Sequence, residues 1–208
     1  MKAIEQLIER HPELNVCAEQ IRKAFAAIVE TYRNDGRLLC CGNGGSAADS
    51  EHIVGELMKS FKRPRPIPAA VRTALTEQGP EAMALADTLE GSLAAIALVS
   101  HTALMTAYAN DRSWDAAFAQ QVLGLGRAGD ALIAISTSGN AADCVNAARV
   151  AKAKGLKTIA LTGEGGGKLA QVCDVAICVP ARETYLVQEL HLPVYHALCA
   201  AVEDELFG

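Results

Sequence analysis

Short apolar runs alternate along this chain with longer segments in which apolar residues recur at helical spacing. The runs of strand length lie at Leu38–Cys41, Leu93–Val99, Ala131–Ile135, Lys157–Thr162 and Asp174–Val179. Strands that are apolar throughout and alternate with helices are typical of a parallel sheet with both faces covered. The pattern therefore predicts an α/β fold, a three-layer sandwich around a five-stranded parallel sheet.

The first helical segment precedes all the predicted strands. Residues 1–35 carry apolar positions at helical spacing, with a break near His11 and Pro12, and form a predicted N-terminal helical arm. Its apolar face needs a partner, which in compact α/β units is often a neighbouring subunit, so we expect an oligomer. Residues 36–208 are predicted to form a single core.

Later helices are expected at 81–89, at 101–126 in two pieces, at 141–154 and at 184–206. Prolines interrupt the pattern between residues 63 and 91, which makes this segment the most irregular part of the chain.

Composition and charge narrow the classes of function. A chain of 208 residues of which 50% are hydrophobic can bury one full core. The net charge of −5 and the lack of a Lys/Arg stripe argue against nucleic-acid binding. No signal-peptide core or membrane-length apolar run is present, so we predict a cytoplasmic protein with no membrane partner. The seven cysteines lack CxxC spacing, which favours buried thiols over disulfides or a zinc–thiolate site.

Two turns rich in glycine and hydroxyl groups directly follow predicted strands. They are GNGGS at 42–46 and STSGN at 136–140, and each leads into a predicted helix. Backbone N–H groups and hydroxyls at helix N-termini can bind a phosphate without Lys or Arg. The nucleotide fingerprints GxGxxG and GxxxxGK[ST] are absent, and STSGN alone could simply cap its helix. Because both turns follow strand ends, where ligands bind in such sheets, we interpret them as a phosphate site.

Four side chains could carry chemistry. His52 and Glu56 are four residues apart on the helix after GNGGS and therefore share one face. Gln188 and His196 lie on the last helix, which contains Pro193 and is expected to bend there. Imidazole, carboxylate and amide groups suit zinc or another divalent ion, and Glu with His also forms an acid–base pair. The spacing alone leaves metal binding, metal-free catalysis and a structural role open.

Together these motifs resemble the sugar isomerase (SIS) domain family, and within it the phosphoheptose isomerases. The resemblance covers nearly the whole chain and rests on CGNGGSAAD at 41–49 with His52 and Glu56, Asn110-Asp111, ISTSGN at 135–140, LTGEGGGKLA at 161–170 and QELHLPVYH at 188–196. It implies a flavodoxin-like SIS fold. It also implies an aldose–ketose isomerase that converts sedoheptulose 7-phosphate to D-glycero-D-manno-heptose 7-phosphate through an enediol.

The same resemblance implies roles for individual residues. Glu56 would be the base that moves a proton between C1 and C2, and His196 the acid that serves the carbonyl and hydroxyl oxygens. A divalent metal, expected to be one Zn²⁺ per subunit, would be held by His52, Glu56, Gln188 and His196. The family also implies a homotetramer with sites across subunits. The residues implied to bind the phosphate and the sugar are Asn43, Gly44, Gly45, Ser46, Asn110, Asp111, Ser136, Thr137, Ser138 and Gln188.

Some features depart from the family pattern. Ala141 follows STSGN where another serine is common, Tyr185 stands before Gln188 where a small or acidic residue is common, and the segment 63–91 is longer than expected. These departures bear on the exact sugar more than on the reaction class.

Other functions are compatible with the same fold. One is a non-catalytic SIS protein of the replication-initiator-binding type, which acts by protein contact. Another is an isomerase of a different sugar phosphate, and a third is a sugar-phosphate-sensing regulatory domain. The non-catalytic relative lacks the Glu/His pair, so the presence of Glu56 and His196 favours an enzyme.

Overall fold

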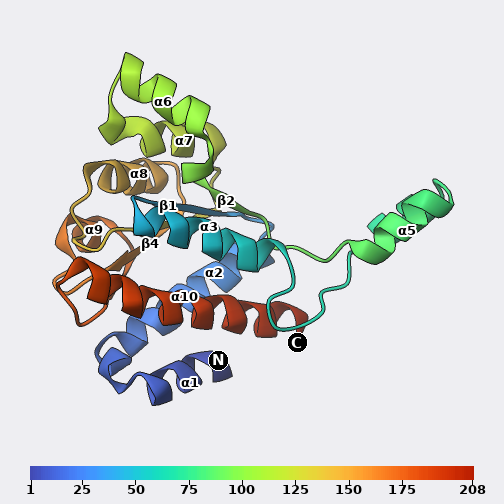
Figure 1. The fold of residues 1–208 in the computed structure, drawn as a ribbon, viewed down its shortest axis with the longest axis horizontal. Coiled ribbons are helices and arrows are strands. Elements are labelled where there is room, and N and C mark those ends of the chain that lie inside the picture. The colour runs from blue at the N-terminus through green and yellow to red at the C-terminus, as the bar shows by residue number, and fades with distance from the viewer.

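The computed structural model describes residues 1–208 and contains one five-stranded sheet whose strands are all parallel (Figure 1). The strands are β1 (Leu38–Gly42), β2 (Ala95–Ala97), β3 (Ala131–Ile135), β4 (Lys157–Thr162) and β5 (Val175–Cys178). The α-helices are α1 (Lys2–Arg10), α2 (Ala18–Arg33), α3 (Gly45–Met58), α4 (Ala69–Thr76), α5 (Pro80–Thr88), α6 (Thr102–Asp111), α7 (Ala117–Leu125), α8 (Ala142–Ala153), α9 (Gly167–Val172) and α10 (Thr184–Phe207). Short 3-10 turns are η1 (Pro12–Cys17), η2 (Leu98–Ser100) and η3 (Trp114–Ala116).

The strands order themselves β2-β1-β3-β4-β5 across the sheet. This is the flavodoxin-like order, in which the chain leaves β1 towards one edge and returns at β3 to build the other. The predicted α/β fold with a five-stranded parallel sheet is therefore confirmed. β2 is shorter than the apolar run 93–99, because this edge strand pairs with β1 over three residues only and the chain then turns at η2.

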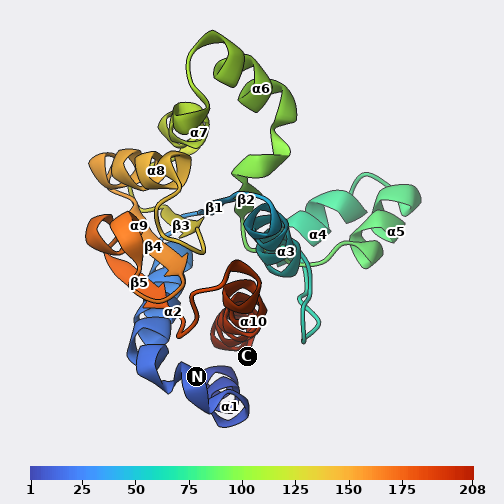
Figure 2. The same ribbon diagram turned by 60° about the vertical axis from the view of Figure 1, so that its left-hand side comes forward.

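Both faces of the sheet are buried, which explains why its strands are apolar throughout. Side chains alternate between the faces along each strand. Leu38 and Cys40 of β1 join a core with α1, α2, α3 and α10, whereas Leu39 and Cys41 join a second core with α6, α7 and α8. Figure 2 shows these helices on opposite sides of the sheet. The arrangement is the predicted three-layer sandwich.

The apolar face of the N-terminal arm packs against other helices of the same chain. The apolar face of α1, with Ala3, Ile4 and Leu7 buried, belongs to the same core as α10, and α1 lies alongside α10 in Figures 1 and 2. The sequence predicts a neighbouring subunit as the partner of this face, but α10 of the same chain covers it, so this helix alone gives no argument for an oligomer.

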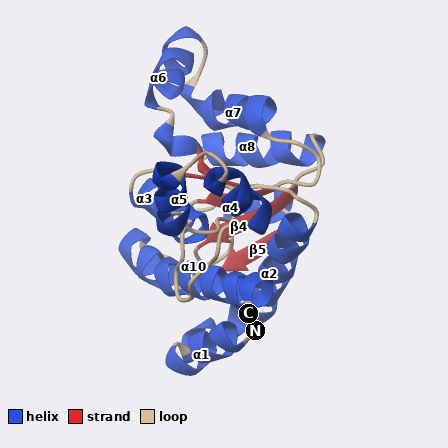
Figure 3. Ribbon diagram, turned by 90° about the vertical axis from the view of Figure 1, so that its right-hand side faces the viewer, coloured by secondary structure: helices blue, strands red, loops and turns tan.

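The irregular segment between β1 and β2 folds into a helical hairpin. α5 matches the helix expected at 81–89, while α4 was not predicted, because Pro64, Pro66 and Pro68 dominate the pattern just before it. The two helices pack on each other and project from the body of the protein in Figures 1 and 2, and they lie in front of it in Figure 3, where this side faces the viewer. No residue of α4 is buried.

No helix combines the length and the apolar composition that crossing a bilayer requires.

A buried ion pair joins the end of α3 to α10. Arg65 donates from Nε to Glu203 at 2.7 Å, and both side chains are fully buried. The same guanidinium donates to the backbone carbonyls of Leu57 at 2.6 Å and Glu56 at 3.0 Å, in the last turn of α3. These carbonyls lack partners within the helix, so Arg65 acts as a cationic cap at its C-terminus.

The Glu203 carboxylate accepts hydrogen bonds from backbone N–H groups as well as from Arg65. The N–H groups of Phe61 and Lys62 donate to its two oxygens at 2.9 and 2.8 Å. Burial opposes ionisation of this carboxyl, but these donors and Arg65 outweigh it and keep the pKa of Glu203 below its usual range. The loop after α3 is therefore fixed to α10 by one ionised side chain.

Removing Arg65 tests how much this contact contributes. Arg65→Met leaves a buried carboxylate without its cation and α3 without its cap, so we expect a loss of about 3–5 kcal/mol in the free energy of unfolding in urea. Arg63→Met is the matched control, because Arg63 pairs with Asp204 at the surface and should cost less than about 1 kcal/mol. Equal losses in the two variants would contradict the buried-pair explanation.

A second buried ionisable group is His191 of α10, which has no exposed surface. Burial disfavours the charged imidazolium and lowers the pKa of His191 to about 4. The unfolded chain, with a pKa of about 6.5, therefore takes up a proton that the folded chain does not. Protonation of His191 therefore does not lower the free energy of unfolding above about pH 6.5, but it lowers this free energy increasingly as the pH drops towards 4.

We expect His191 to remove about 2 kcal/mol of unfolding free energy between pH 7 and pH 5. The variant His191→Leu should flatten the pH dependence in this window, measured by urea denaturation at several pH values. His11→Gln, at a partly exposed histidine, is the control and should keep the wild-type slope. An unchanged slope in His191→Leu would refute the assignment.

Candidate active site

A polar cavity lies where β1 and β3 end. Its volume is about 370 Å³. Strand order reverses between these two strands, and the crevice outside such a switch point is where ligands bind in open α/β sheets. The lining residues are Asn43, Gly44, Gly45, Ser46, Ile135, Ser136, Thr137, Ser138, Ala141, Thr184 and Gln188. The two predicted turns therefore meet in one cavity.

The glycines of the GNGGS turn allow the backbone conformation that leads into α3. Gly44 has a φ of +56°, a conformation that favours glycine, and Gly45 opens the helix. The amide of Asn43 donates to both oxygens of the buried Asp143 at 3.0 and 2.9 Å, which ties the turn to α8. Gly44, Gly45 and Ser46 line the cavity, so the positive end of the α3 dipole lies at its wall.

The STSGN turn is held in place by the glycine-rich loop after β4. A Cβ on Gly139, whose φ is +66°, would come within 2.0 Å of the carbonyl oxygen of Gly166. Gly163 donates its N–H to the carbonyl of Thr137 at 2.9 Å, and Leu169 donates to Gly139 at 3.0 Å. The loop 163–167 therefore supports the cavity wall without lining it.

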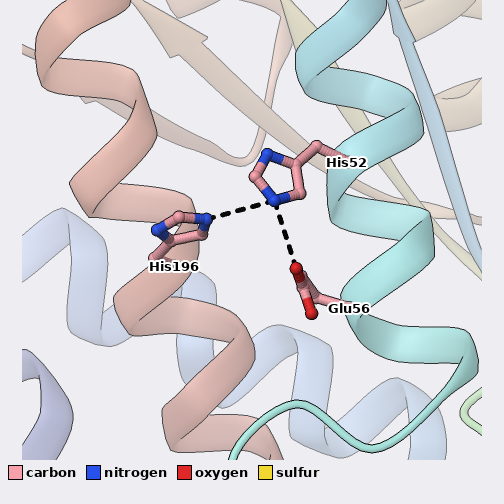
Figure 4. A group of neighbouring side chains, drawn as sticks. All are labelled: His52, Glu56 and His196. Carbon is pink, nitrogen blue, oxygen red and sulfur yellow. Dashed lines mark hydrogen bonds and ion pairs between the residues drawn. The ribbon is translucent and has the colours of Figure 1, made fainter.

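A second cluster lies on the facing sides of α3 and α10 (Figure 4). His52 Nε2 is 3.1 Å from Glu56 Oε1 and 3.4 Å from His196 Nε2. The three ligand atoms all lie within 4.8 Å of one another, so these residues could hold a metal ion. The spacing predicted that His52 and Glu56 share a face, and the family resemblance implied that His196 lies with them, as it does in the structure.

Two further side chains connect to this cluster from behind. The Tyr195 hydroxyl is 3.2 Å from Asp49 Oδ1 and 2.9 Å from His52 Nδ1. Burial raises the pKa of Asp49, an effect that the hydrogen bond from Tyr195 opposes. Burial also lowers the pKa of His196, reinforced by His52 and opposed by Glu56. A neutral His196 is therefore favoured at neutral pH.

The cavity and the cluster of His52, Glu56 and His196 lie one after the other along α3 and α10, which run in the same direction. At one end, a Cβ on Gly45 would come within 2.4 Å of Gln188 Nε2. Further along, His52 meets His196. At 1.5 Å per residue, His52 lies about 9 Å and Glu56 about 15 Å along the axis of α3 from Ser46. Side chains on a helix lean towards its N-terminus, which brings the Glu56 carboxylate back to His52.

The structure brings most of the predicted residues together, but not all. Those of GNGGS and STSGN line the cavity, together with Gln188, and the departure at Ala141 also falls on its wall. Gln188 lies with its amide against Gly45, so its part in metal binding stays a prediction. Asn110 and Asp111 end α6, are exposed, and lie outside this cavity. Their contact with the sugar also stays a prediction.

Sequence reasoning missed several residues that support the site. Arg65 and Glu203 gave no signal, because a basic residue in a proline-rich segment and an acid near the C-terminus resemble surface charges. Asp49 and Tyr195 could have been found from spacing, since Asp49 lies three residues before His52 on the same helix face and Tyr195 adjoins His196. Thr184, at the start of α10, was also overlooked.

Fold and site together define a class, an α/β protein with flavodoxin-like strand order and a cavity lined by hydroxyl groups and glycines at its switch point. Two family models, both of the SIS domain, match residues 90–201 and 1–97. This chain belongs to the SIS domain family.

Similar proteins cover nearly the whole chain. A phosphoheptose isomerase of Thiobacillus denitrificans is 40% identical over 194 residues, which span 92% of this chain and 86% of that protein. The structure of a phosphoheptose isomerase from Neisseria gonorrhoeae is 33% identical with a TM-score of 0.75, covering 96% of this chain and 94% of that chain. One from Francisella tularensis is 29% identical with a TM-score of 0.77 and the same two coverages.

Ser138 offers a test of the cavity as a phosphate site. Its side chain is exposed on the cavity wall, and a hydrogen bond to a charged phosphate contributes about 1.5–3 kcal/mol. Ser138→Ala should therefore raise the KM for sedoheptulose 7-phosphate at least about tenfold, with the fold intact by circular dichroism. Ser92→Ala, at an exposed serine outside the cavity, should leave it unchanged. An unaltered KM in Ser138→Ala would place the phosphate elsewhere.

Proposed function

We propose that this chain is a phosphoheptose isomerase, which converts sedoheptulose 7-phosphate to D-glycero-D-manno-heptose 7-phosphate through an enediol. One observation carries the proposal. The helix that starts at the cavity, α3, also delivers His52 and Glu56 to a cluster with His196. A single rigid element thus connects an anion-binding end to an acid–base end, as the isomerisation of a terminally phosphorylated sugar requires.

The spacing of the two ends suits a seven-carbon chain. An extended chain advances about 1.2 Å per bond, so C2 and C1 of sedoheptulose 7-phosphate lie about 8–10 Å from its phosphorus. This distance is close to the ~9 Å along α3 between Ser46 and His52. A phosphate at the start of α3 therefore brings C1 and C2 to the level of the cluster.

The phosphate is bound without a basic side chain. No Lys or Arg lines the cavity. N–H groups at the start of α3 and the hydroxyls of Ser46, Ser136, Thr137 and Ser138 donate to the phosphate oxygens, and the helix dipole favours their negative charge. Asn43, Gly44, Gly45 and Gln188 contact the sugar next to them.

Proton transfer is the role of Glu56 and His196. The Glu56 carboxylate removes a proton from C1 of the ketose and returns it to C2, while His196 donates a proton to the carbonyl oxygen and accepts one from the hydroxyl at C1. The enediol forms between these two steps. Glu56 is suited to this work because its side chain is only 13% exposed, yet it lies beside an open imidazole cluster.

The His52, Glu56 and His196 donors fit a divalent metal, and we propose one Zn²⁺ per subunit, with Gln188 as a further ligand. When bound, such an ion would polarise the substrate's oxygens. His196 Nε2 cannot bind an ion and carry a proton together, so its two proposed roles compete.

Assembly and surroundings complete the proposal. We propose a homotetramer in which α6 brings Asn110 and Asp111 to a neighbouring subunit's cavity, since these residues are exposed and lie outside the cavity of their own chain. We also propose that residues 1–35 form a helical arm and residues 36–208 an SIS domain. The protein is proposed to be cytoplasmic and to have no nucleic-acid partner.

Glu56→Gln tests the proposed chemistry. The variant keeps the shape of the side chain but loses the base, so turnover of sedoheptulose 7-phosphate should fall by about 10²–10⁴-fold. The measurement is NMR of deuterium exchange at C1 and C2 in ²H₂O. Glu51→Gln, at an exposed carboxylate of the same helix, should remain active. Wild-type protein that binds the sugar without exchange would instead identify a non-catalytic SIS protein, and exchange with another ketose phosphate only would change the substrate.

A further inference from the structure

Asp49 and Tyr195 lie behind His52, on the side away from the proposed metal and substrate. Tyr195 is 2% exposed, so no bulk water competes for its hydroxyl. Its two hydrogen-bonding neighbours are Asp49 Oδ1 at 3.2 Å and His52 Nδ1 at 2.9 Å. Asp49 Oδ2 is buried and has no partner, so Tyr195 is the one side chain that donates to this carboxylate.

The positions of the protons on Asp49, Tyr195 and His52 follow from the number of hydrogens that each side chain can donate. A tyrosine hydroxyl has one hydrogen, and an ionised aspartate only accepts. The hydrogen of Tyr195 therefore goes to Asp49, and the Tyr195 oxygen is left to accept one from His52. A neutral His52 that donates to this oxygen carries its proton on Nδ1. A neutral imidazole protonated at Nδ1 has a lone pair at Nε2.

That lone pair faces the cluster. Nε2 is the atom that lies 3.1 Å from Glu56 Oε1 and 3.4 Å from His196 Nε2, whereas Nδ1 lies on the opposite edge of the ring (Figure 4). A lone pair beside a carboxylate oxygen is unfavourable unless a cation lies between them. The assigned tautomer is thus the one that a metal ligand needs, and it is the wrong one for a simple hydrogen bond to Glu56.

Ring packing holds the same orientation. The rings of His52 and Tyr195 meet edge to face at 5.4 Å, and those of Tyr195 and His196 at 5.0 Å. Tyr195 therefore touches both imidazoles of the cluster, and its hydroxyl reaches the back of one of them.

We propose that Asp49 and Tyr195 are positioning residues that fix His52 as its Nδ1–H tautomer, so that Nε2 is presented to a divalent cation. This inference rests on the proposed metal site for its purpose, but the tautomer itself is a property of the metal-free protein. Partners behind metal-binding histidines typically change metal affinity by about 10–100-fold when they are removed.

The test has a spectroscopic and a binding measurement. Long-range ¹H–¹⁵N correlation spectra of metal-stripped, ¹⁵N-histidine-labelled protein at pH 8 report the tautomer of each of the five histidines, and a His52→Gln spectrum assigns His52. We expect Nδ1–H in the wild type. Tyr195→Phe removes the acceptor, and Asp49→Ala frees the Tyr195 hydroxyl to donate to His52, so both should shift His52 towards Nε2–H.

Zn²⁺ affinity, measured by competition with a chromophoric chelator, should fall about 10–100-fold in both variants. Tyr32→Phe removes the same hydroxyl at a site where it donates to the carbonyl of Ala94, and should change neither measurement. An Nε2–H signal for His52 in the wild type, or an unchanged tautomer in Tyr195→Phe, would overturn the proposal. If the wild type shows the expected tautomer but binds no Zn²⁺, the metal proposal fails while the positioning role stands.

Discussion

The buried contact between Arg65 and Glu203 is the constraint on which the site depends. It joins the C-terminal carbonyls of α3 to α10 at the end of the helix pair farthest from the phosphate cavity. Taking two charges out of water is costly, and the pair is stabilised because both ions also bind several backbone groups. An apolar contact could hold the helices together equally well, but it would not fix their register in this directional way.

Register matters because the site is divided between the two helices. His52 and Glu56 belong to α3 and His196 to α10, so a small slide of one helix along the other would separate the ligand atoms that now lie within 4.8 Å. At the opposite end, Gly45 leaves space for the amide of Gln188. Contacts at both ends, and the Asp49–Tyr195–His52 chain between them, fix the same alignment.

How far the sequence predicts this arrangement depends on the range of the interactions. The sheet, its strands and the two turns follow from local patterns, and their meeting at one edge follows from the rules for parallel sheets. The pairing of His52 with Glu56 is also local. The approach of His196 to them is not, because it depends on how α10 packs against α3. The same is true of Arg65, whose burial comes from a loop that returns to the core. Of the two helices in the segment between β1 and β2, α5 was predicted, whereas α4 was missed for a local reason, since the prolines just before it hid its helical signal.

Placing the two chemical functions on one helix has a consequence for specificity. In the proposed binding mode the phosphate would lie at the start of α3 and the proposed acid–base cluster at the level of His52, about 9 Å along the same helix, so the helix would set the distance between them. A sugar phosphate with two fewer carbons is shorter by about 2.5 Å, and its C1 and C2 would fall short of Glu56 when its phosphate is bound. A longer one would press against the cluster. If the phosphate binds as proposed, the fixed rise of α3 would therefore contribute to discrimination by chain length.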